Sequence, residues 1–259
     1  MRSNPSPLNN KLLAAMTSDV QARLFPHLEL TDLPLGAVVY DVGGVLSAAY
    51  FPADCIISLL YCMNNGSTGE IAIVGNEGVV GISLFMGGLS TSSRAIVQSA
   101  GWAYQLPASR LLEEFERHGD MMSLMLRYSQ SLITQMTQTA ACNRHHSVDE
   151  QLARWLLLSL DRLSGNSMTM TPQLIANMLS ISVARVAEVA SRLERLGVIS
   201  YSKGRIKVVD RSTLEKLSCE CYRVCKVETD RLLPAAGAAL PRKKRMLVAA
   251  TSRHDRVEN

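Results

Sequence analysis

Residues 171–210 read TPQLIANMLSISVARVAEVASRLERLGVISYSKGRIKVVD, and this stretch decides the fold. Thr171 followed by Pro172 predicts a helix start, because the threonine oxygen can accept a free amide and proline fits the first helical position. Ser180 falls in a turn, and Ser182 is placed to cap a second helix with apolar residues at helical spacing. The stretch therefore begins with two short helices joined by a tight turn.

A two-stranded ribbon is predicted after Gly197, which suits the end of the second helix. Two alternating runs lie at 199–201 and 206–208, and the segment between them places Lys203 and Arg205 at a hairpin tip. A helix pair followed by such a ribbon is typical of a winged helix-turn-helix, which lays its second helix in the DNA major groove. The alternative is a small structural helix pair with a solvated polar face.

The candidate DNA contacts lie on the outer side of the second helix and on the ribbon. Arg185 could reach guanine or a phosphate, and Glu188 could accept a hydrogen bond from a cytosine amine. Val183 offers an apolar contact of the kind that suits a thymine methyl. Cations at the ribbon tip would contact phosphates and position the protein without reading sequence. The predicted DNA-binding residues are Thr171, Ser182, Val183, Ala184, Arg185, Glu188, Arg192, Lys203 and Arg205.

Charge is distributed unevenly along the chain. Residues 171–226 carry ten Lys+Arg and five Asp+Glu, a net of +5, whereas residues 1–140 carry seven and eleven, a net of −4. A local excess of positive charge favours phosphate binding through counterion release. We therefore expect the C-terminal part to bind double-stranded DNA in a salt-sensitive way.

Length and composition favour a cytoplasmic protein of two domains plus a tail. The chain has 259 residues, of which 47% are hydrophobic, and no apolar run approaches the roughly 20 residues that span a bilayer. Six cysteines in a chain of this size are not a disulfide framework, and a reducing compartment suits them better. We expect no membrane association.

The N-terminal half is predicted to be a β-barrel. Residues 1–10 are polar and are expected to be disordered, and residues 11–119 follow as a sensor domain of short β-rich runs separated by Gly, Pro and Asn-Gly signals. Many short strands with regular turns indicate a sandwich or jelly-roll barrel. With the helices around it, the predicted fold class is α+β.

A long helix is predicted over 120–142, with a heptad seam whose members step by four, three, four, three and four residues. Such a seam favours pairing with a second copy of the chain, which makes this the predicted dimerisation helix. The alternative is a helix that packs on its own barrel. The seam residues, and hence the predicted dimer interface, are Met121, Met125, Tyr128, Leu132, Gln135 and Thr139.

The DNA-binding domain is predicted to occupy residues 147–226. Ser147 with Glu150 forms a capping box that begins its first helix, so residues 143–146 are the expected hinge. Residues 234–259 are Ala-rich and then basic, and we expect a disordered basic tail.

An acidic barrel, a long heptad helix and a C-terminal winged helix, in that order, resemble the cAMP receptor protein/Fnr (Crp/Fnr) family of bacterial transcription regulators. The resemblance covers about residues 10–230 and is strongest in TPQLIANMLSISVARVAEVASRLERLGVISY and AAYFPADCIISLLYCM. It implies a cyclic-nucleotide-binding-like sensor barrel whose effector controls DNA binding. It also implies a homodimer on a palindromic promoter site that contacts RNA polymerase. We expect no enzymatic activity, because no catalytic site is visible in the sequence.

The residues of the family's effector and base-reading sites differ in part here. Cyclic-nucleotide members hold the phosphate with Gly-Glu-Leu-Gly followed closely by Arg-Ser-Ala, whereas residues 75–81 read GNEGVVG and the arginine comes later. The effector is unknown, and a cyclic nucleotide is one candidate. For Arg94 the alternative to an anion contact is a strand-end arginine paired with a local carboxylate. The family's Arg-Glu-x-x-x-Arg reader would fall on Val183, Ala184 and Glu188, so its operator is not carried over. The candidate effector-binding residues are Glu77, Gly78, Gly81, Arg94 and Ala95.

Two alternatives concern other kinds of function. No cysteine precedes Cys55, which argues against the N-terminal iron–sulfur site of the oxygen-sensing members. Cys219, Cys221 and Cys225 form a late C-x-C-x3-C group that would serve a thiol- or metal-responsive variant, although the sequence has no recognisable catalytic or metal motif. The other alternative is a ligand-binding protein whose winged domain contacts proteins instead of DNA.

Overall fold

The structure is a computed structural model that describes residues 4–233. The chain begins with the 3-10 turn η1 (Pro7–Asn9) and continues through α1 (Lys11–Ala15), α2 (Ser18–Leu24) and η2 (Phe25–His27). The expectation of disorder over residues 1–10 is wrong for residues 4–10, whereas residues 1–3 and the expected basic tail lie outside the described residues. Asn10 is fully buried, and its Nδ2 donates to the carbonyls of Pro52 and Gly78 at 2.9 and 2.8 Å. This buried asparagine ties the N-terminal segment to the barrel.

Two antiparallel sheets face each other in the N-terminal half and form the predicted jelly-roll barrel. One sheet has the order β1-β7-β3 and the other the order β2-β6-β4-β5. Their inward side chains, with Phe51 and Leu106 among the fully buried ones, make one hydrophobic core. The strands and the turn η3 are β1 (Glu29–Leu33), β2 (Val38–Tyr40), β3 (Ala48–Pro52), β4 (Ile56–Cys62), β5 (Thr68–Val74), η3 (Ile82–Leu84), β6 (Ser93–Ser99) and β7 (Gly101–Pro107).

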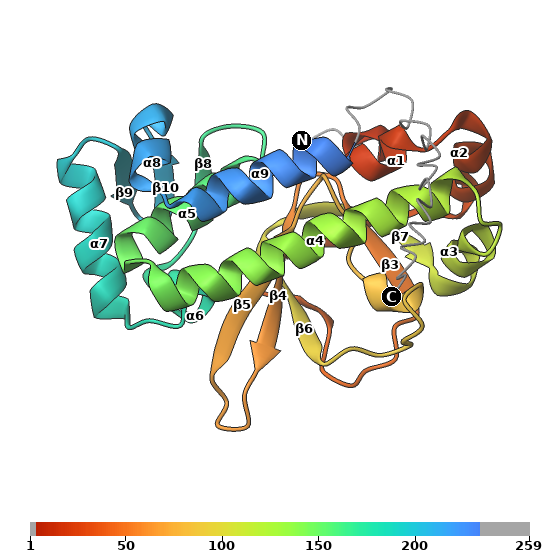
Figure 1. The fold of residues 1–259 in the computed structure, drawn as a ribbon, viewed down its shortest axis with the longest axis horizontal. Coiled ribbons are helices and arrows are strands. Elements are labelled where there is room, and N and C mark those ends of the chain that lie inside the picture. The colour runs from red at the N-terminus through yellow and green to blue at the C-terminus, as the bar shows by residue number, and fades with distance from the viewer. Residues whose placement is uncertain (1–3, 234–259) are drawn as a thin grey trace, which may run out of the picture.

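The helix α3 (Ala108–Phe115) leads into the long helix α4 (Asp120–His145), which runs across the molecule in Figure 1. All six residues of the predicted seam are buried within the single chain. Met125 and Tyr128 belong to the barrel core, and the Gln135 amide both accepts from the Ile73 N–H and donates to the Ile73 carbonyl. In the single chain these six residues are covered by the chain's own barrel and, at Thr139, by Arg154, so they are not exposed for pairing with a second copy.

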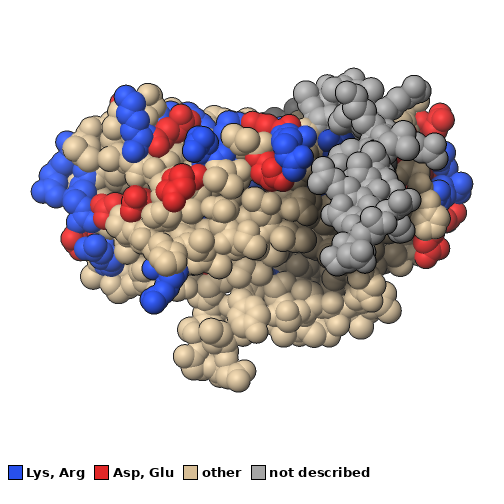
Figure 2. Space-filling model, in the orientation of Figure 1, with Lys and Arg blue, Asp and Glu red and all other residues tan. Residues whose placement is uncertain are grey.

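A second stripe on α4 faces outward. Leu126 and Ile133 are 49% and 42% exposed. Together with Gln130, Thr137 and Ala140 they form a stripe whose members are alternately four and three residues apart. Figure 2 shows mainly uncharged surface over the middle of α4. The helix thus has one buried and one exposed heptad stripe.

The C-terminal part has the predicted winged helix-turn-helix. Its sheet has the order β8-β10-β9, and β9 and β10 form the wing. The last helix runs back beside α4 in Figure 1, with a 2.8 Å hydrogen bond between the hydroxyls of Ser131 and Thr229. The elements are α5 (Val148–Leu160), β8 (Ser167–Thr169), α6 (Pro172–Leu179), α7 (Val183–Arg195), β9 (Ile199–Ser202), β10 (Arg205–Val208), α8 (Arg211–Leu217) and α9 (Glu220–Leu232).

Buried polar contacts join the winged part to the barrel. Trp155 of α5 donates its indole N–H to the Glu70 carboxyl of β5 at 2.8 Å. Arg162 pairs with Glu77 at 2.7 Å, and both side chains are nearly buried. Among residues 4–233, no single helix has the length and hydropathy to cross a membrane, and only the α6–α7 pair, bent by 106°, meets those two measures together.

Candidate nucleic-acid interface

The turn between α6 and α7 has the local geometry that the sequence indicated. The Thr171 hydroxyl accepts from the Leu174 N–H at 3.2 Å at the start of α6. Ser180 ends this helix in the left-handed region, with φ of 55°, which costs a non-glycine residue about 1 kcal/mol. The Ser182 hydroxyl then accepts from the Arg185 N–H at 3.2 Å and caps α7. Both helices are therefore capped by the predicted residues.

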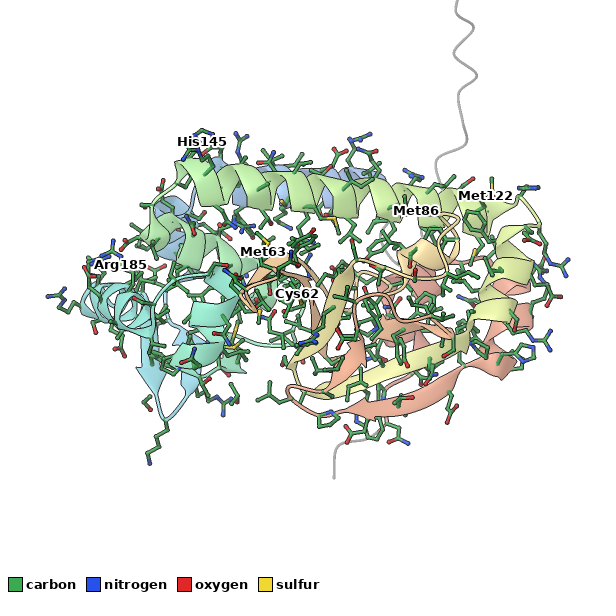
Figure 3. The ribbon with its side chains drawn as sticks, turned by 90° about the horizontal axis from the view of Figure 1, so that it is seen from below. Cys62, Met63, Met86, Met122, His145 and Arg185 are labelled. Carbon is green, nitrogen blue, oxygen red and sulfur yellow. The ribbon has the colours of Figure 1, made fainter. Side chains whose placement is uncertain are left out.

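The helix α7 buries one side and exposes the other. Val186, Val189 and Leu193 are at most 2% exposed and pack in the hydrophobic core of the winged part. The other side carries most of the predicted contacts, and Figure 3 shows Arg185 pointing away from the protein. Ser182, Val183, Ala184 and Glu188 are exposed on this outer side. The outer side of α7 is therefore exposed to solvent and accessible to a binding partner such as the DNA major groove.

Ion pairs distinguish Arg185 and Arg192 of α7. Arg185 pairs with Glu188 at 2.5 Å, and this bond, with a second one from Arg192, lowers the pKa of the Glu188 carboxyl. Arg192 also binds Asp149 of α5 through two hydrogen bonds of 2.8 and 2.7 Å. Arg192 therefore fixes α7 to α5, whereas the ion pair of Arg185 within residues 4–233 is with a neighbour on its own helix.

The wing ends in a two-residue turn at Lys203 and Gly204. Both have positive φ, 51° and 71°, as a type I′ hairpin turn requires. Lys203 is exposed at the tip, whereas Arg205 donates to the Ser167 hydroxyl of β8 at 2.8 Å. Lys207, exposed on β10, adds a cation that was not among the predicted contacts.

The predicted effector residues are held by separate partners. Glu77 is engaged by Arg162, while Arg94 makes two hydrogen bonds to Asp41 at 2.8 and 2.7 Å on the exposed surface. Gly78 lies against the Tyr128 ring, Gly81 has a φ of 108° that favours glycine, and Ala95 is buried in the barrel core. The structure thus does not bring Glu77 and Arg94 into one anion site, and Arg94 has the local carboxylate partner of the alternative interpretation.

The late cysteine group is divided in the structure. Cys225 packs in the core of the winged part, whereas Cys219 and Cys221 meet Cys142 and His146. The hydrogen bond from Cys142 lowers the pKa of the Cys219 thiol to about 6. Sequence reasoning missed Cys142 and His146 because 77 residues separate Cys142 from Cys219, and no local pattern links the two segments.

Comparisons with known proteins agree with this architecture. Residues 150–217 match the family model of the Crp-like helix-turn-helix domain. This match identifies residues 150–217 as a Crp-like helix-turn-helix domain. The chain is accordingly a transcription regulator with a DNA-binding domain of the Crp/Fnr type, and regulators of this type are not enzymes. No curated protein matches the chain.

Solved structures share the whole arrangement at low sequence identity. FixK2 from Bradyrhizobium japonicum superposes with a TM-score of 0.65 at 15% identity, covering 74% of this chain and 98% of that one. TTHB099, a CRP-family regulator from Thermus thermophilus, gives 0.60 at 16% identity, with 73% and 96% covered. The c-di-GMP-responsive regulator CLP from Xanthomonas campestris gives 0.57 at 14% identity, with 74% and 99% covered. At these identities the similarity shows the fold alone.

Proposed function

We propose that this regulator acts in the bacterial cytoplasm as a homodimer that reads a palindromic DNA site with two copies of α7. In this proposal residues 11–119 are the sensor domain, residues 120–142 the dimerisation helix and residues 147–226 the DNA-binding domain. The observation that carries it is the exposed outer side of α7 beside a wing whose tip holds Lys203. RNA polymerase is the further partner that the family implies.

The residues on α7 are assigned different tasks. Arg185 reaches a base edge or a phosphate, because Glu188, its carboxylate partner in the part of the chain that the structure describes, lies on the same exposed surface and can be exchanged for DNA. Val183 and Ala184, at the start of the helix, make apolar contacts of the kind that suit thymine methyls. Lys203 and Arg205 on the wing contact phosphates. Arg192 stays with Asp149 and supports the helix rather than reading sequence.

The outward stripe of α4 is the surface that we assign to the dimer. Leu126 and Ile133 lie on it with heptad spacing, and residues 128–143 carry no charged side chain. Two such stripes can pair as a short coiled coil and remove these apolar side chains from water. The two recognition helices would then address half-sites about one helical turn apart, roughly 34–36 Å.

One experiment tests the DNA-binding part. Purified protein is used to select bound sites from random DNA at fixed salt, with and without cAMP. We expect an enriched palindrome, and we expect Arg185→Ala combined with Lys203→Ala to abolish the enrichment. Arg110→Ala combined with Arg117→Ala removes the same charge from the distant helix α3 and the turn after it, and should leave the enrichment intact. Equal loss in both double variants would show that only net charge matters and would contradict the assignment to α7 and the wing.

A second experiment tests the dimer surface. Ile133→Glu should convert the dimer to a monomer in sedimentation analysis while leaving the circular dichroism spectrum unchanged, because Ile133 is 42% exposed in the single chain. Leu35→Glu, at a barrel position that is 45% exposed, is the matched control and should remain dimeric. A dimer that persists in Ile133→Glu would refute this interface.

A further inference from the structure

Four potential metal ligands meet where the end of α4 approaches the start of α9. Their ligand atoms all lie within 4.8 Å of one another, and the three cysteines are at most 5% exposed. Two of the residues lie at the end of α4 and two at the start of α9. We name this group the Cys3His cluster, and its members are Cys142, His146, Cys219 and Cys221.

The distances within the Cys3His cluster suit a single tetrahedral ion. The Sγ atoms of Cys142 and Cys219 are 3.5 Å apart, and the Sγ atom of Cys221 is 3.6 Å from Nδ1 of His146. Sulfur ligands at about 2.3 Å from a zinc ion lie about 3.8 Å from one another in a tetrahedron. A disulfide requires about 2.05 Å between its sulfurs, so the observed separation corresponds to two free thiols. The cluster is close to the shape that zinc requires.

The second nitrogen of His146 has the partner that zinc-binding histidines commonly have. Nε2 lies 3.3 Å from the carboxylate of Glu220, while Nδ1 faces Cys221. A carboxylate that accepts the Nε2–H fixes the tautomer and leaves the Nδ1 lone pair for a metal. His146 is therefore held in an orientation in which Nδ1 can serve as the fourth ligand. Its neighbour His145 lies at the exposed end of α4 (Figure 3) and is not part of the cluster.

A buried arginine provides compensating charge. Arg154 is 3% exposed and forms no ion pair with any carboxylate among residues 4–233, and its Nε has no hydrogen-bond partner there. Its Nη1 donates to the Thr139 hydroxyl at 3.3 Å. The hydrogen bond to Cys219 raises the pKa of the Cys142 thiol and burial raises the pKa of the Cys221 thiol to about 11, and the charge of Arg154 acts in the opposite direction on both. Three thiolates and a divalent ion carry one net negative charge, which balances a guanidinium that would otherwise be buried without a counter-ion.

We propose that the Cys3His cluster binds one zinc ion, which fixes the start of α9 to the end of α4. Sulfur and imidazole ligands in a tetrahedron select zinc among the common divalent ions of the cell. Four protein ligands leave no open position, so the ion is structural rather than catalytic. The ligand atoms are also too close together to surround a cluster of several irons. The ion would stiffen the hinge between α4 and the DNA-binding domain, since His146 directly precedes the Ser147 cap of α5.

The test measures metal content and affinity on the full-length protein. Protein purified without chelator should contain one zinc per chain by plasma mass spectrometry, and Co²⁺ in place of zinc should give the absorption bands of tetrahedral thiolate coordination. Cys221→Ser should lose the zinc. Cys225→Ser, a buried cysteine on the same helix outside the cluster, is the matched control and should retain it. Glu220→Gln, at an exposed position that leaves folding intact, should weaken zinc binding by about 10- to 100-fold in competition with a chromophoric chelator.

Several results would overturn the proposal. One is a protein that takes up neither zinc nor cobalt while all six thiols are free. Another is a disulfide between Cys142 and Cys219 in the purified protein, and a third is bound iron with acid-labile sulfide. Zinc retained in full by Cys221→Ser, or an unchanged zinc affinity in Glu220→Gln, would remove these residues from the site. Loss of zinc in Cys225→Ser as well would mean that any buried substitution disrupts it.

Discussion

A buried carboxyl group between the barrel and α5 predicts how the stability of this regulator depends on pH. Glu70 Oε1 accepts from the Trp155 indole at 2.8 Å, and Oε2 lies 2.6 Å from the Ser58 hydroxyl. The same hydroxyl lies 2.7 Å from Oε1 of Gln98, whose amide nitrogen donates to Ser159 at 3.1 Å. Ser58 has one hydrogen and faces two acceptors, so both contacts are hydrogen bonds only when the Glu70 carboxyl is protonated and donates to Ser58.

The pKa of Glu70 determines how strongly the free energy of unfolding depends on pH. Burial raises the pKa of this carboxyl from 4.5 to about 7, although hydrogen bonds from Ser58 and Trp155 and the charges of Arg154 and Arg162 act in the opposite direction. The folded state therefore holds a proton that the unfolded state releases at lower pH. The resulting stability is fully present below pH 4.5 and is lost as pH rises through about 7. Between pH 5 and pH 8 the loss is about 2–3 kcal/mol.

The variant Glu70→Gln isolates this contribution because it keeps the shape of the side chain and removes the titration. The free energy of unfolding is measured with urea at intervals from pH 5 to pH 8. Over this range the decrease for the wild type should exceed the decrease for Glu70→Gln by about 2–3 kcal/mol. In thermal unfolding this corresponds to a relative gain in Tm of roughly 4–12 °C. Glu116→Gln, an exposed substitution of the same kind, should follow the wild type. Parallel curves for Glu70→Gln and the wild type over this pH range would refute the reasoning.

Three further substitutions test other parts of the structure. Lys203→Ala should weaken DNA binding about equally for all sequences. In a plot of log K for DNA binding against log KCl concentration, the magnitude of the slope should fall by about one. An unchanged slope would exclude a phosphate contact of Lys203. Gly78→Ala would place a Cβ in steric overlap with the Tyr128 ring and hydroxyl, so it should destabilise the fold by about 1–3 kcal/mol in urea unfolding, and wild-type stability would contradict this packing. Ser147→Ala removes the capping box of α5 and should cost about 1 kcal/mol by the same measurement, with no loss expected if the cap is not formed in solution.

The winged part could be predicted from sequence because its signals are local. The Thr171 and Ser182 caps, the turn at Ser180 and the basic hairpin tip all depend on residues within a few positions of one another. Local backbone chemistry decides such features almost independently of the rest of the chain. Contacts between distant segments have no such signal, and for this reason the pairing of Arg192 with Asp149 and the Cys3His cluster were not foreseen.

The seam on α4 shows a second limit. Heptad spacing establishes that Met121, Met125 and Tyr128 share a face, but it does not identify what covers that face. Leu126 and Ile133 have the same spacing on the opposite side, so the sequence contains two heptad stripes. The spacing alone does not show which stripe packs on the barrel and which is left for a second copy of the chain. The barrel takes the more apolar stripe, since burying methionine and tyrosine side chains in the chain's own core stabilises the monomer fold. The stripe of Leu126, Gln130, Ile133, Thr137 and Ala140, which has no methionine or aromatic side chain, is left on the outside.

The helix α5 is the element through which the barrel and the recognition helix are joined. Trp155 binds Glu70 of β5, and six residues earlier Asp149 holds Arg192 of α7. A continuous helix of 13 residues moves as a unit, so a displacement of β5 that carries Trp155 must also carry Asp149. Deprotonation of Glu70 leaves the single Ser58 hydrogen to serve two acceptors, Glu70 and Gln98, and places a buried charge at this contact, which favours separation of α5 from the barrel. The same residue that makes stability depend on pH therefore lies two side-chain contacts away from the surface assigned to DNA.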